Sequence, residues 1–243
     1  MSTKVLVTTK KDLSSIYFEK HGWDIIWYGS KPVYNGKYDI VYFRDPFNDE
    51  EVTQDSIMRS LTDVRGTRSI DKINTYAQTL SFEDKYNQYQ TYSDLMPLTF
   101  LPSKCVFVKG KHLAKKRISQ RSKDVLFDID NVPISDDWIF QEIVDIAEEL
   151  RVYIVFGHII QQASIKSSKI NGKVKIIGKR DLNARELSFC QKISERSKLD
   201  FIGVDIAVLR NGEIVLIEVN RSPQFKKYLE LYDESTLSSI LDI

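Results

Sequence analysis

The sequence has few cysteines and no long apolar run. Its 243 residues include two cysteines, Cys105 and Cys190, which stand alone and match no metal-binding spacing. This argues against a disulfide-stapled scaffold and favours two buried free thiols in a reducing compartment. No apolar segment reaches the length of a membrane span, and the first residues lack a signal-peptide pattern. We therefore expect a cytoplasmic protein that does not enter a membrane.

An excess of charge of one sign is also missing. The 35 Lys and Arg residues and 34 Asp and Glu residues give a formal net charge of +1. No overall field then draws the protein toward nucleic acid or a membrane, and any basic site must be local. The remaining composition, 42% hydrophobic and 28% charged residues, is that of a globular protein. The chain is long enough for one large domain or for two or three lobes.

The segment most informative about function is 201–220, FIGVDIAVLRNGEIVLIEVN. Two apolar, β-branched runs flank Asn211-Gly212, a dipeptide typical of a tight β-hairpin because both residues tolerate positive φ. A two-residue turn at this point predicts that Arg210 lies opposite Glu213. The turn also sets the register of the two strands.

The predicted register places Asp205 opposite Glu218, with Asn220 on the same face as Glu218. Directly opposed side chains lie about 4.5–5.5 Å apart at Cβ, where like charges destabilise a sheet. We therefore expect a cation at these carboxylates, and an all-oxygen donor set suits Mg²⁺ or Mn²⁺. A solvated surface hairpin is the alternative, but apolar residues on both faces of the strands argue against it.

Asp205 on one strand and Glu218-Val219-Asn220 on the next resemble the metal-binding end of the ATP-grasp superfamily. The resemblance is to the branch with ribosomal-protein glutamate ligases and glutathione synthetases, and it is better in the C-terminal half of the chain. It implies that Asp205, Glu218 and Asn220 hold the Mg²⁺ ions that bridge the phosphates of ATP. It also implies an α/β protein with an ATP-grasp fold and an N-terminal Rossmann-like lobe.

The first part of the chain alternates between predicted strands and helices. Strands are predicted at 4–9, 24–28 and 38–43, and helices at 12–20 and 48–61. This alternation favours a parallel α/β lobe, in which ligands bind at the carboxyl ends of strands. Arg44 and Asp45 follow the third strand, so they are candidates for contact with a substrate. The alternative is that they pair with each other or cap the next segment.

The segment 83–99 resembles the connector of the family, where Asp84-Lys85 opens a helix and Pro97-Leu98-Thr99 follows. In relatives the lysine of this segment reaches an ATP phosphate, so Lys85 is a candidate for nucleotide binding. A solvated helix is the alternative. The next segment, 105–109 (CVFVK), is predicted to be an apolar strand. Its Lys109 takes the place of a family lysine that contacts the α- and β-phosphates.

Glycine is scarce where the resemblance requires it. Relatives cover the phosphates with backbone N–H groups of a glycine-rich loop. Here Gly110 is followed by a basic stretch made up of Lys111, Lys115, Lys116, Arg117, Arg121 and Lys123. Side-chain cations could replace the backbone amides at a greater cost in conformational entropy. Two other interpretations stay open: an anionic acceptor such as an acidic peptide or nucleic acid binds this stretch, or it is a solvated loop.

Further strands are predicted at 125–130 and 138–144. The end of the second one, Gln-Glu-Ile-Val, resembles the hinge whose backbone hydrogen-bonds the adenine edge, with isoleucine in place of the usual aromatic residue. An apolar wall beside a planar base agrees with how such pockets are built. The residues implied to contact the base are Gln141, Glu142, Ile143 and Val144.

A second hairpin is predicted to turn at Gly157-His158, with Glu149 opposite Lys166 and Arg151 opposite Ser164. The resemblance implies that Glu149 binds the ribose of ATP and that Arg151 lies near the transferred phosphate. We count Lys166 with the nucleotide-binding residues. A structural pair between Glu149 and Lys166 is the alternative, but it leaves Arg151 unexplained.

The segment 171–180 is predicted to be a polar loop and corresponds to a variable insertion of the family. In relatives this insertion carries a contact to the γ-phosphate, for which Lys179, Arg180 and Asn183 are candidates. An amphipathic helix is predicted at 183–198. Arg221, next to the expected metal ligands, is a candidate for binding an acceptor or phosphate oxygen.

The predicted organisation has three parts: an N-terminal lobe with connector (1–98), a lid (99–145) and a C-terminal subdomain with the metal site (146–243). The implied activity is ATP-dependent ligation of a carboxylate to an amine through an acylphosphate. Mg²⁺ or Mn²⁺, Lys109 and Arg151 would neutralise the phosphates. The substrates, small molecules or peptides, and a homo-oligomeric state stay open. So do two other functions: an ATP-binding protein that has lost turnover, and an ATP-dependent modifier of a peptide or nucleic acid.

Overall fold

The computed structural model describes residues 3–10, 12–28, 38–44, 71–73, 82–118, 125–127, 131, 135–167, 175–197, 199–223, 231 and 234–242. The predicted helix at 48–61, Asp45, Arg121 and Lys123 lie outside the described residues. Within the described part of the chain, no helix is long and apolar enough to span a membrane. The described strands form three sheets, and the three-part division of the chain stays a prediction.

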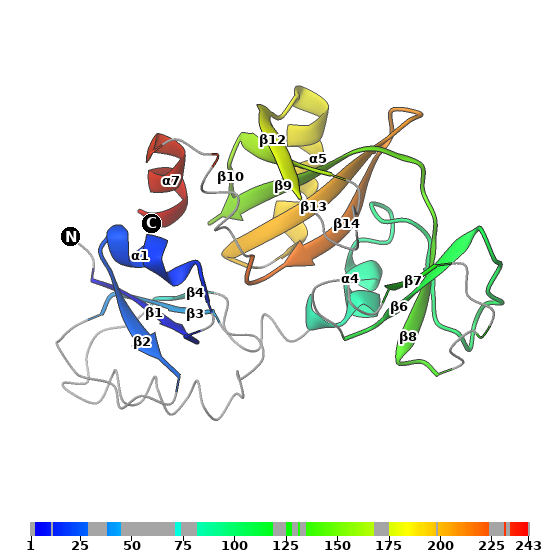
Figure 1. Ribbon diagram of the computed structural model, residues 1–243, viewed down its shortest axis with the longest axis horizontal. Coiled ribbons are helices and arrows are strands. Elements are labelled where there is room, and N and C mark those ends of the chain that lie inside the picture. The colour runs from blue at the N-terminus through cyan, green and yellow to red at the C-terminus, as the bar shows by residue number, and fades with distance from the viewer. Residues whose placement is uncertain are drawn as a thin grey trace.

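The N-terminal sheet is parallel, with strand order β2-β1-β3-β4 (Figure 1). Its elements are β1 (Lys4–Thr8), α1 (Ser15–Lys20), β2 (Trp23–Trp27), β3 (Ile40–Phe43) and β4 (Asp71–Ile73). All three strand pairings are parallel. This confirms the parallel lobe that the alternation of strands and helices predicted.

The C-terminal helix α7 (Glu234–Leu241) returns to this N-terminal lobe, so the two ends of the described chain lie close together (Figure 1). The indole of Trp23 donates a hydrogen bond to the carbonyl of Leu241 at 2.8 Å. Trp23 also belongs to a hydrophobic core that joins Phe18 and Tyr42 of the lobe to Tyr153 and Phe201 of the C-terminal sheet. The two parts are therefore held together by a common core.

The middle sheet is antiparallel, with strand order β5-β8-β6-β7. The connector helix α4 (Lys85–Thr91) precedes it, and its strands are β5 (Thr99–Phe100), β6 (His112–Lys116), β7 (Val125–Leu126) and β8 (Trp138–Glu142). The predicted helix start at Asp84-Lys85 is confirmed, because the Asp84 carboxylate accepts hydrogen bonds from the backbone N–H groups of Tyr86 and Asn87.

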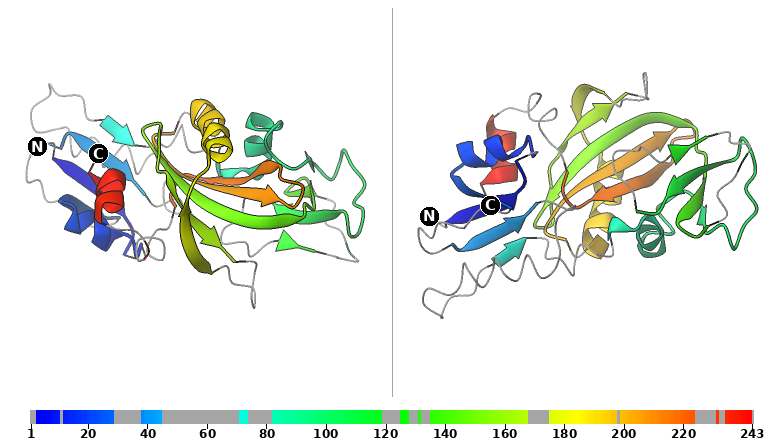
Figure 2. Two further views of the ribbon diagram at one scale, coloured as in Figure 1. Left: turned by 90° about the horizontal axis from the view of Figure 1, so that it is seen from above. Right: turned by 60° about the horizontal axis from the view of Figure 1, so that its bottom comes forward.

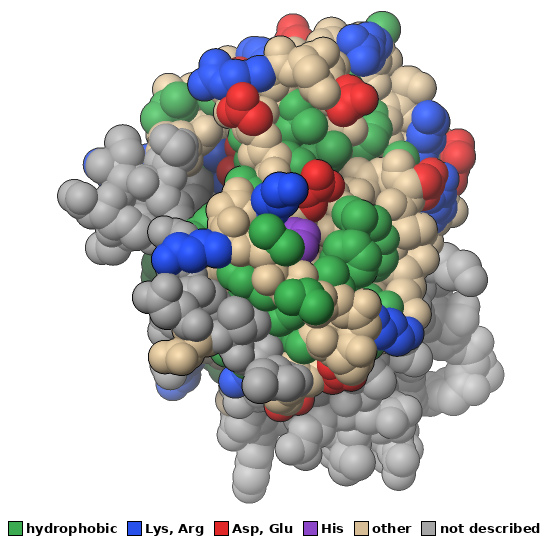
Figure 3. Space-filling model, turned by 90° about the vertical axis from the view of Figure 1, so that its right-hand side faces the viewer, with side chains coloured by type: hydrophobic (Ala, Val, Ile, Leu, Met, Phe, Trp, Pro, Cys, Tyr) green, Lys and Arg blue, Asp and Glu red, His purple; other side chains and the backbone are tan. Residues whose placement is uncertain are grey.

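The predicted strand at 105–109 is wrong, because the chain forms a loop there and the strand β6 begins at His112. Of the loop residues, Phe107 packs against Phe140, with ring centroids 5.2 Å apart. Val106 is 81% exposed, and apolar side chains gather on this end of the molecule (Figure 3). Cys105 is half-buried, so the expectation of two buried thiols holds for Cys190 alone. High β-propensity was misleading because β6 already pairs with β8.

The C-terminal sheet has strand order β12-β11-β9-β13-β14, with β10 also paired to β9. Its elements are β9 (Ile146–Val155), β10 (His158–Ile159), β11 (Gln162–Lys166), β12 (Ile176–Asp181), α5 (Ala184–Ser197), β13 (Phe201–Leu209) and β14 (Ile214–Asn220). Helix α5 covers one face of the sheet, where Cys190 and Ile193 join the core (Figure 2). The predicted loop at 171–180 is wrong for 176–180, which belong to the edge strand β12.

The predicted turn of the β13–β14 hairpin is wrong, but the predicted register is confirmed. The backbone N–H of Leu209 donates to the carbonyl of Glu213 at 2.8 Å, so the turn has three residues and Arg210 does not face Glu213. Gly212 has a φ of 84° in this turn. A register shift beside Asp205 offsets the longer turn, and Asp205 lies opposite Glu218 as predicted.

The β9–β11 pairing has the same history. The turn lies at Phe156-Gly157 rather than one residue later, and both residues have positive φ, 46° and 78°. Two additional residues between β10 and β11 compensate for this difference. Glu149 therefore lies opposite Lys166, and Arg151 opposite Ser164, as predicted.

Candidate active site

Charged side chains from four neighbouring strands lie on one face of the C-terminal sheet. Arg151 on β9 lies opposite Asp205 on β13, which in turn lies opposite Glu218 on β14. Lys166 on β11 lies opposite Glu149, two residues before Arg151 on β9. Paired residues and residues two apart along a strand share a face. We call these five side chains, Glu149, Arg151, Lys166, Asp205 and Glu218, the charged cluster.

Asp205 is the centre of the charged cluster and is 3% exposed. Arg151 donates to both carboxylate oxygens, with 2.6 Å between Nη2 and Oδ2. The Lys166 ammonium lies 3.0 Å from Asp205 Oδ2 and donates to Glu149. Burial opposes ionisation of Asp205, but the charges of Arg151 and Lys166 outweigh it and lower the pKa to about 2. Asp205 is therefore ionised at neutral pH.

The predicted metal ligands Asp205, Glu218 and Asn220 converge on this face. The cation expected beside Asp205 is in part supplied by the protein itself, through Arg151 and Lys166. The charged cluster nevertheless holds three carboxylates against two cations, so its formal charge is negative. The buried side-chain nitrogen of Asn220 has no hydrogen-bond partner among the described residues, so the fold does not use this amide.

These donors fit Mg²⁺. The described residues contain no group of three or more His, Cys, Asp or Glu side chains arranged as a complete metal site. Mg²⁺ does not need one, because it commonly binds one or two carboxylates and takes its other oxygens from phosphates and water. Asp205, Glu218 and the amide of Asn220 are such an incomplete set, next to two cations that suit phosphate groups.

Gly203 leaves room for this arrangement. It lies opposite Tyr153 of β9 and Asn220 of β14. A Cβ at this position would lie 2.6 Å from the Cβ of Pro223 and 3.3 Å from the Cδ of Arg151. Either the segment after β14 or the arginine would then have to move.

We therefore expect Gly203→Ala to lower the free energy of unfolding by about 1–3 kcal/mol, the usual cost of overpacking a core. Gly178→Ala is the matched control, because a Cβ there meets its nearest atom, Ile165 Cδ1, at an ordinary 3.6 Å. Urea unfolding of both variants measures the difference. Equal stability of the two variants would contradict the close approach at Gly203.

The hinge presents backbone rather than polar side chains. The backbone N–H groups of Glu142 and Ile143 donate to the carbonyls of Leu98 and Lys111, at 2.9 and 2.8 Å. The Ile143 side chain is 38% exposed, so it can serve as an apolar wall. Gln141 is buried, and its amide accepts from Lys115 Nζ at 2.7 Å and donates to Thr99 at 2.9 Å. Its side chain therefore stabilises the lid, and Glu142, Ile143 and Val144 remain the candidates for base contact.

Part of the basic stretch belongs to the fold. Arg117 binds the Asp84 carboxylate through Nε and Nη2, the shortest contact being 2.5 Å, and its carbonyl accepts from the backbone N–H of Lys85 at 3.0 Å. These contacts fix the start of α4 to the end of β6. Lys85 lies in the first turn of α4, whereas Lys109 is exposed in the loop before β6. Their roles in phosphate binding stay predictions.

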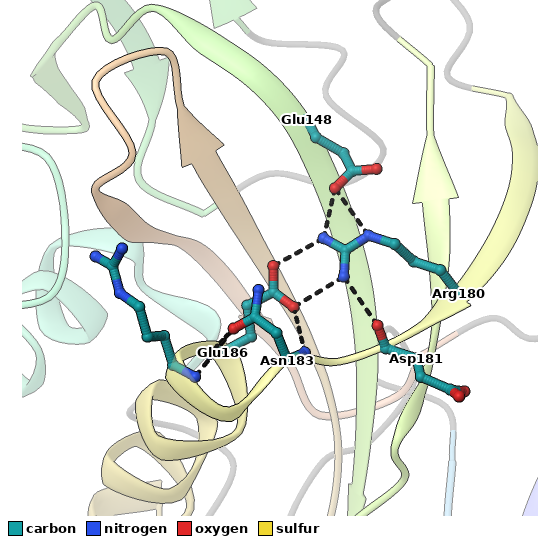
Figure 4. Close-up of polar contacts among 6 residues, drawn as sticks. Glu148, Arg180, Asp181, Asn183 and Glu186 are labelled. Carbon is teal, nitrogen blue, oxygen red and sulfur yellow. Dashed lines mark hydrogen bonds and ion pairs between the residues drawn. The ribbon is translucent and has the colours of Figure 1, made fainter.

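Asn183 caps helix α5 (Figure 4). Its side-chain oxygen accepts from the backbone N–H groups of Arg185 and Glu186, at 2.9 and 3.0 Å, and Glu186 accepts from the Asn183 N–H at 2.9 Å. This reciprocal pattern is a capping box. Arg180 binds both Glu148 and Glu186 (Figure 4). The structure therefore does not bring Asn183 or Arg180 into the charged cluster. The spacing Asn-x-x-Glu was the sequence signal for the cap.

The two other arginine candidates hold the segment after β14. The side chain of Arg44 is fully buried and donates to Asp12 at 2.7 Å and to the carbonyl of Pro223 at 2.5 Å. Arg221 is 6% exposed and pairs with Glu83 of the connector. The structure thus places both side chains outside the charged cluster, and their roles in substrate binding stay predictions. No sequence pattern indicated Asp12 or Glu83 as their partners, because these pairs join distant segments.

Comparisons with known proteins agree with this geometry. Residues 55–224 match the family model of an ATP-grasp domain, the third family of its clade, and this range is more than two thirds of the chain. No curated protein matches the sequence.

Several solved structures share the fold at low sequence identity. ATP-grasp ligase PsnB, complexed with minimal precursor, Mg and ADP, is 16% identical with a TM-score of 0.64, covering 100% of this chain and 98% of that one. Macrocyclase MdnC from Microcystis aeruginosa MRC, bound with precursor peptide MdnA, is 16% identical with a TM-score of 0.61, covering 99% and 100%. The ADP complex of PurK, N5-carboxyaminoimidazole ribonucleotide synthetase, is 10% identical with a TM-score of 0.68, covering 91% and 71%. The match to the family model shows that the chain belongs to the ATP-grasp superfamily.

Proposed function

We propose that this protein is an ATP- and Mg²⁺-dependent ligase that joins a carboxylate to an amine, with a peptide as one substrate. The observation that carries the proposal is the charged cluster on the C-terminal sheet of an ATP-grasp chain. Two carboxylates and an amide suit Mg²⁺, and two adjacent cations suit the phosphates that Mg²⁺ accompanies.

The side chains of this cluster position charge and do no covalent chemistry. Asp205, Glu218 and Asn220 would hold Mg²⁺, which neutralises phosphate charge when bound. Arg151 is held by both oxygens of Asp205, so its guanidinium is oriented before a phosphate arrives. Lys166 is buried and fixed between Glu149 and Asp205. Such preorganised charges stabilise a transition state without reorganising during the reaction.

The proposed reaction has two steps. A carboxylate oxygen of the first substrate attacks the γ-phosphorus of ATP, the bond from the γ-phosphorus to the bridging oxygen breaks, and ADP leaves with that electron pair. The amine nitrogen of the second substrate then attacks the acyl carbon of the acylphosphate. Phosphate leaves, the amine loses a proton, and an amide remains.

A peptide substrate is favoured over a small molecule by the fold comparisons. PsnB and MdnC are complexed with precursor peptides, and the alignment spans almost the whole of both chains. PurK acts on a small molecule and has 71% of its chain covered. We therefore put peptides first among the acceptors to be tested.

The test is a screen of peptides, amino acids and polyanions for acceptor-stimulated ADP release in the presence of ATP and Mg²⁺. We expect a peptide that contains both a carboxylate and an amine side chain to stimulate ADP release and to lose one water in mass. Tight ATP binding without ADP release for any acceptor would instead support the rival function, an ATP-binding protein without turnover.

The basic stretch keeps a second acceptor class open, a polyanion such as an acidic peptide or nucleic acid. Lys111 and Lys116 are exposed, whereas Arg117 is bound to Asp84 and should be left intact. Lys111→Gln with Lys116→Gln therefore tests polyanion binding without disturbing the joint between lid and connector. Unaltered, salt-independent behaviour of this variant toward polyanions in the same screen would exclude this second class.

A further inference from the structure

Strand β14 lies last in the order of its sheet, so its outer edge has no neighbouring strand among those described. Backbone N–H and C=O groups on a covered edge need other partners, because an unpaired buried polar group destabilises the fold. The connector, which includes helix α4, lies along this edge (Figure 1). At one end of the contact, the backbone N–H of Leu216 donates to the carbonyl of Leu95 at 2.7 Å.

The central contact is made by one side chain, Gln88 of α4. Its Oε1 accepts from the backbone N–H of Val219 at 3.0 Å, and its Nε2 donates to the carbonyl of Val219 at 3.0 Å. The Nε2 group also donates to the carbonyl of Phe82 at 2.6 Å. Gln88 is 3% exposed, so these bonds are shielded from water. Its amide thus binds Val219 as a neighbouring strand would.

Val219 lies between Glu218 and Asn220, the two candidate metal ligands on β14. The N–H and C=O groups of successive strand residues point to opposite edges. Because Val219 is directed outward to Gln88, the backbone groups of Glu218 and Asn220 are directed inward to β13, which carries Asp205. The side chains of the two flanking residues then project together to the face of the charged cluster.

We propose that Gln88 is a positioning residue of the metal site: it fixes the backbone at Val219 and thereby holds Glu218 and Asn220 beside Asp205. This inference rests on the proposed function. Only a primary amide of this length offers a donor and an acceptor together at its end. Helix α4 is a firm support, because its first turn is held to the lid by the pair between Asp84 and Arg117.

The test uses Gln88→Met, which keeps the length and helix propensity but removes both hydrogen bonds. Gln90→Met is the matched control, since Gln90 is exposed on the same helix. Mn²⁺ is the probe, and its binding in the presence of ADP is measured by electron paramagnetic resonance at a temperature where every variant is folded. We expect Mn²⁺ affinity about 10-fold weaker in Gln88→Met, the usual effect of losing an outer support of a metal ligand.

The control should bind Mn²⁺ like the unmodified protein, and excess Mg²⁺ should partly restore turnover of Gln88→Met. A merely structural role would lower the melting temperature but leave Mn²⁺ affinity of the folded protein unchanged, and that result overturns the inference while the proposed function stands. If the unmodified protein itself binds no Mn²⁺ with ADP, the proposed metal site fails, and the inference fails with it.

A second variant keeps the test decisive if Gln88→Met does not fold. Gln88→Glu retains the acceptor for the Val219 N–H but replaces the donor by an oxygen that faces the carbonyls of Val219 and Phe82. We expect weakened Mn²⁺ binding for this variant, together with faster hydrogen exchange of the Val219 amide. Unchanged Mn²⁺ binding despite faster exchange at Val219 would overturn the inference.

Discussion

Glu218→Gln is expected to abolish turnover while leaving the fold intact. The substitution keeps the shape of the side chain but removes a negative charge that the proposed Mg²⁺ site requires. Loss of a group that stabilises transition-state charge commonly lowers kcat by about 10²–10³-fold, so acceptor-stimulated ADP release should fall at least that far. The same variant should bind Mn²⁺ more weakly in the presence of ADP.

Glu213→Gln is the matched control for this experiment. Glu213 lies on the same hairpin, is exposed at the turn, and accepts a hydrogen bond from Asn211 at 2.9 Å. Its replacement changes the net charge equally but should leave turnover unaltered. Wild-type turnover of Glu218→Gln would remove Glu218 from the metal site.

Arg151→Met is expected to destabilise the protein and to abolish turnover. Removing one partner of a buried ion pair leaves the other charge uncompensated, at a cost of about 3–5 kcal/mol. In this variant the buried carboxylate of Asp205 would keep only Lys166 as a cationic partner. Urea unfolding measures the loss of stability, and ADP release measures the loss of turnover.

Two further variants separate the two effects of Arg151. Adding Asp205→Asn to Arg151→Met removes the uncompensated charge, so it should restore part of the stability but none of the activity. Arg210→Met is the control for an exposed pair, since Arg210 and Asp145 are 3.1 Å apart with side chains 70% and 75% exposed. It should change stability by about 0–1 kcal/mol. A loss of stability in Arg151→Met no larger than in this control would contradict the burial of the pair.

The candidate site was largely predictable where it depends on strand register. The predicted turns of both hairpins were wrong, but Asp205 still lies opposite Glu218, and Glu149 opposite Lys166. Bulges adjusted the length of each hairpin, because a slip by one residue would have turned every apolar side chain to the wrong face. Register is therefore determined by the whole strand rather than by the turn.

The strand prediction at 105–109 and the loop prediction for 176–180 failed for a related reason. A short segment becomes a strand only if a neighbouring strand has a free edge for it, and no local pattern reports that edge. β6 takes the place beside β8, which leaves 105–109 in a loop, whereas β11 offers its edge to β12. Propensity alone could not distinguish the two cases.

The sequence by itself determined the type of each main element, the apolar faces, and the pairing of residues within each hairpin, since these follow from side-chain period over a few consecutive residues. The tertiary structure alone decided which elements are neighbours. The pair of Arg151 with Asp205 spans 54 positions, that of Gln88 with Val219 spans 131, and that of Arg44 with Pro223 spans 179. Such contacts form because burial of whole faces brings distant segments together, and only then do their polar groups need partners.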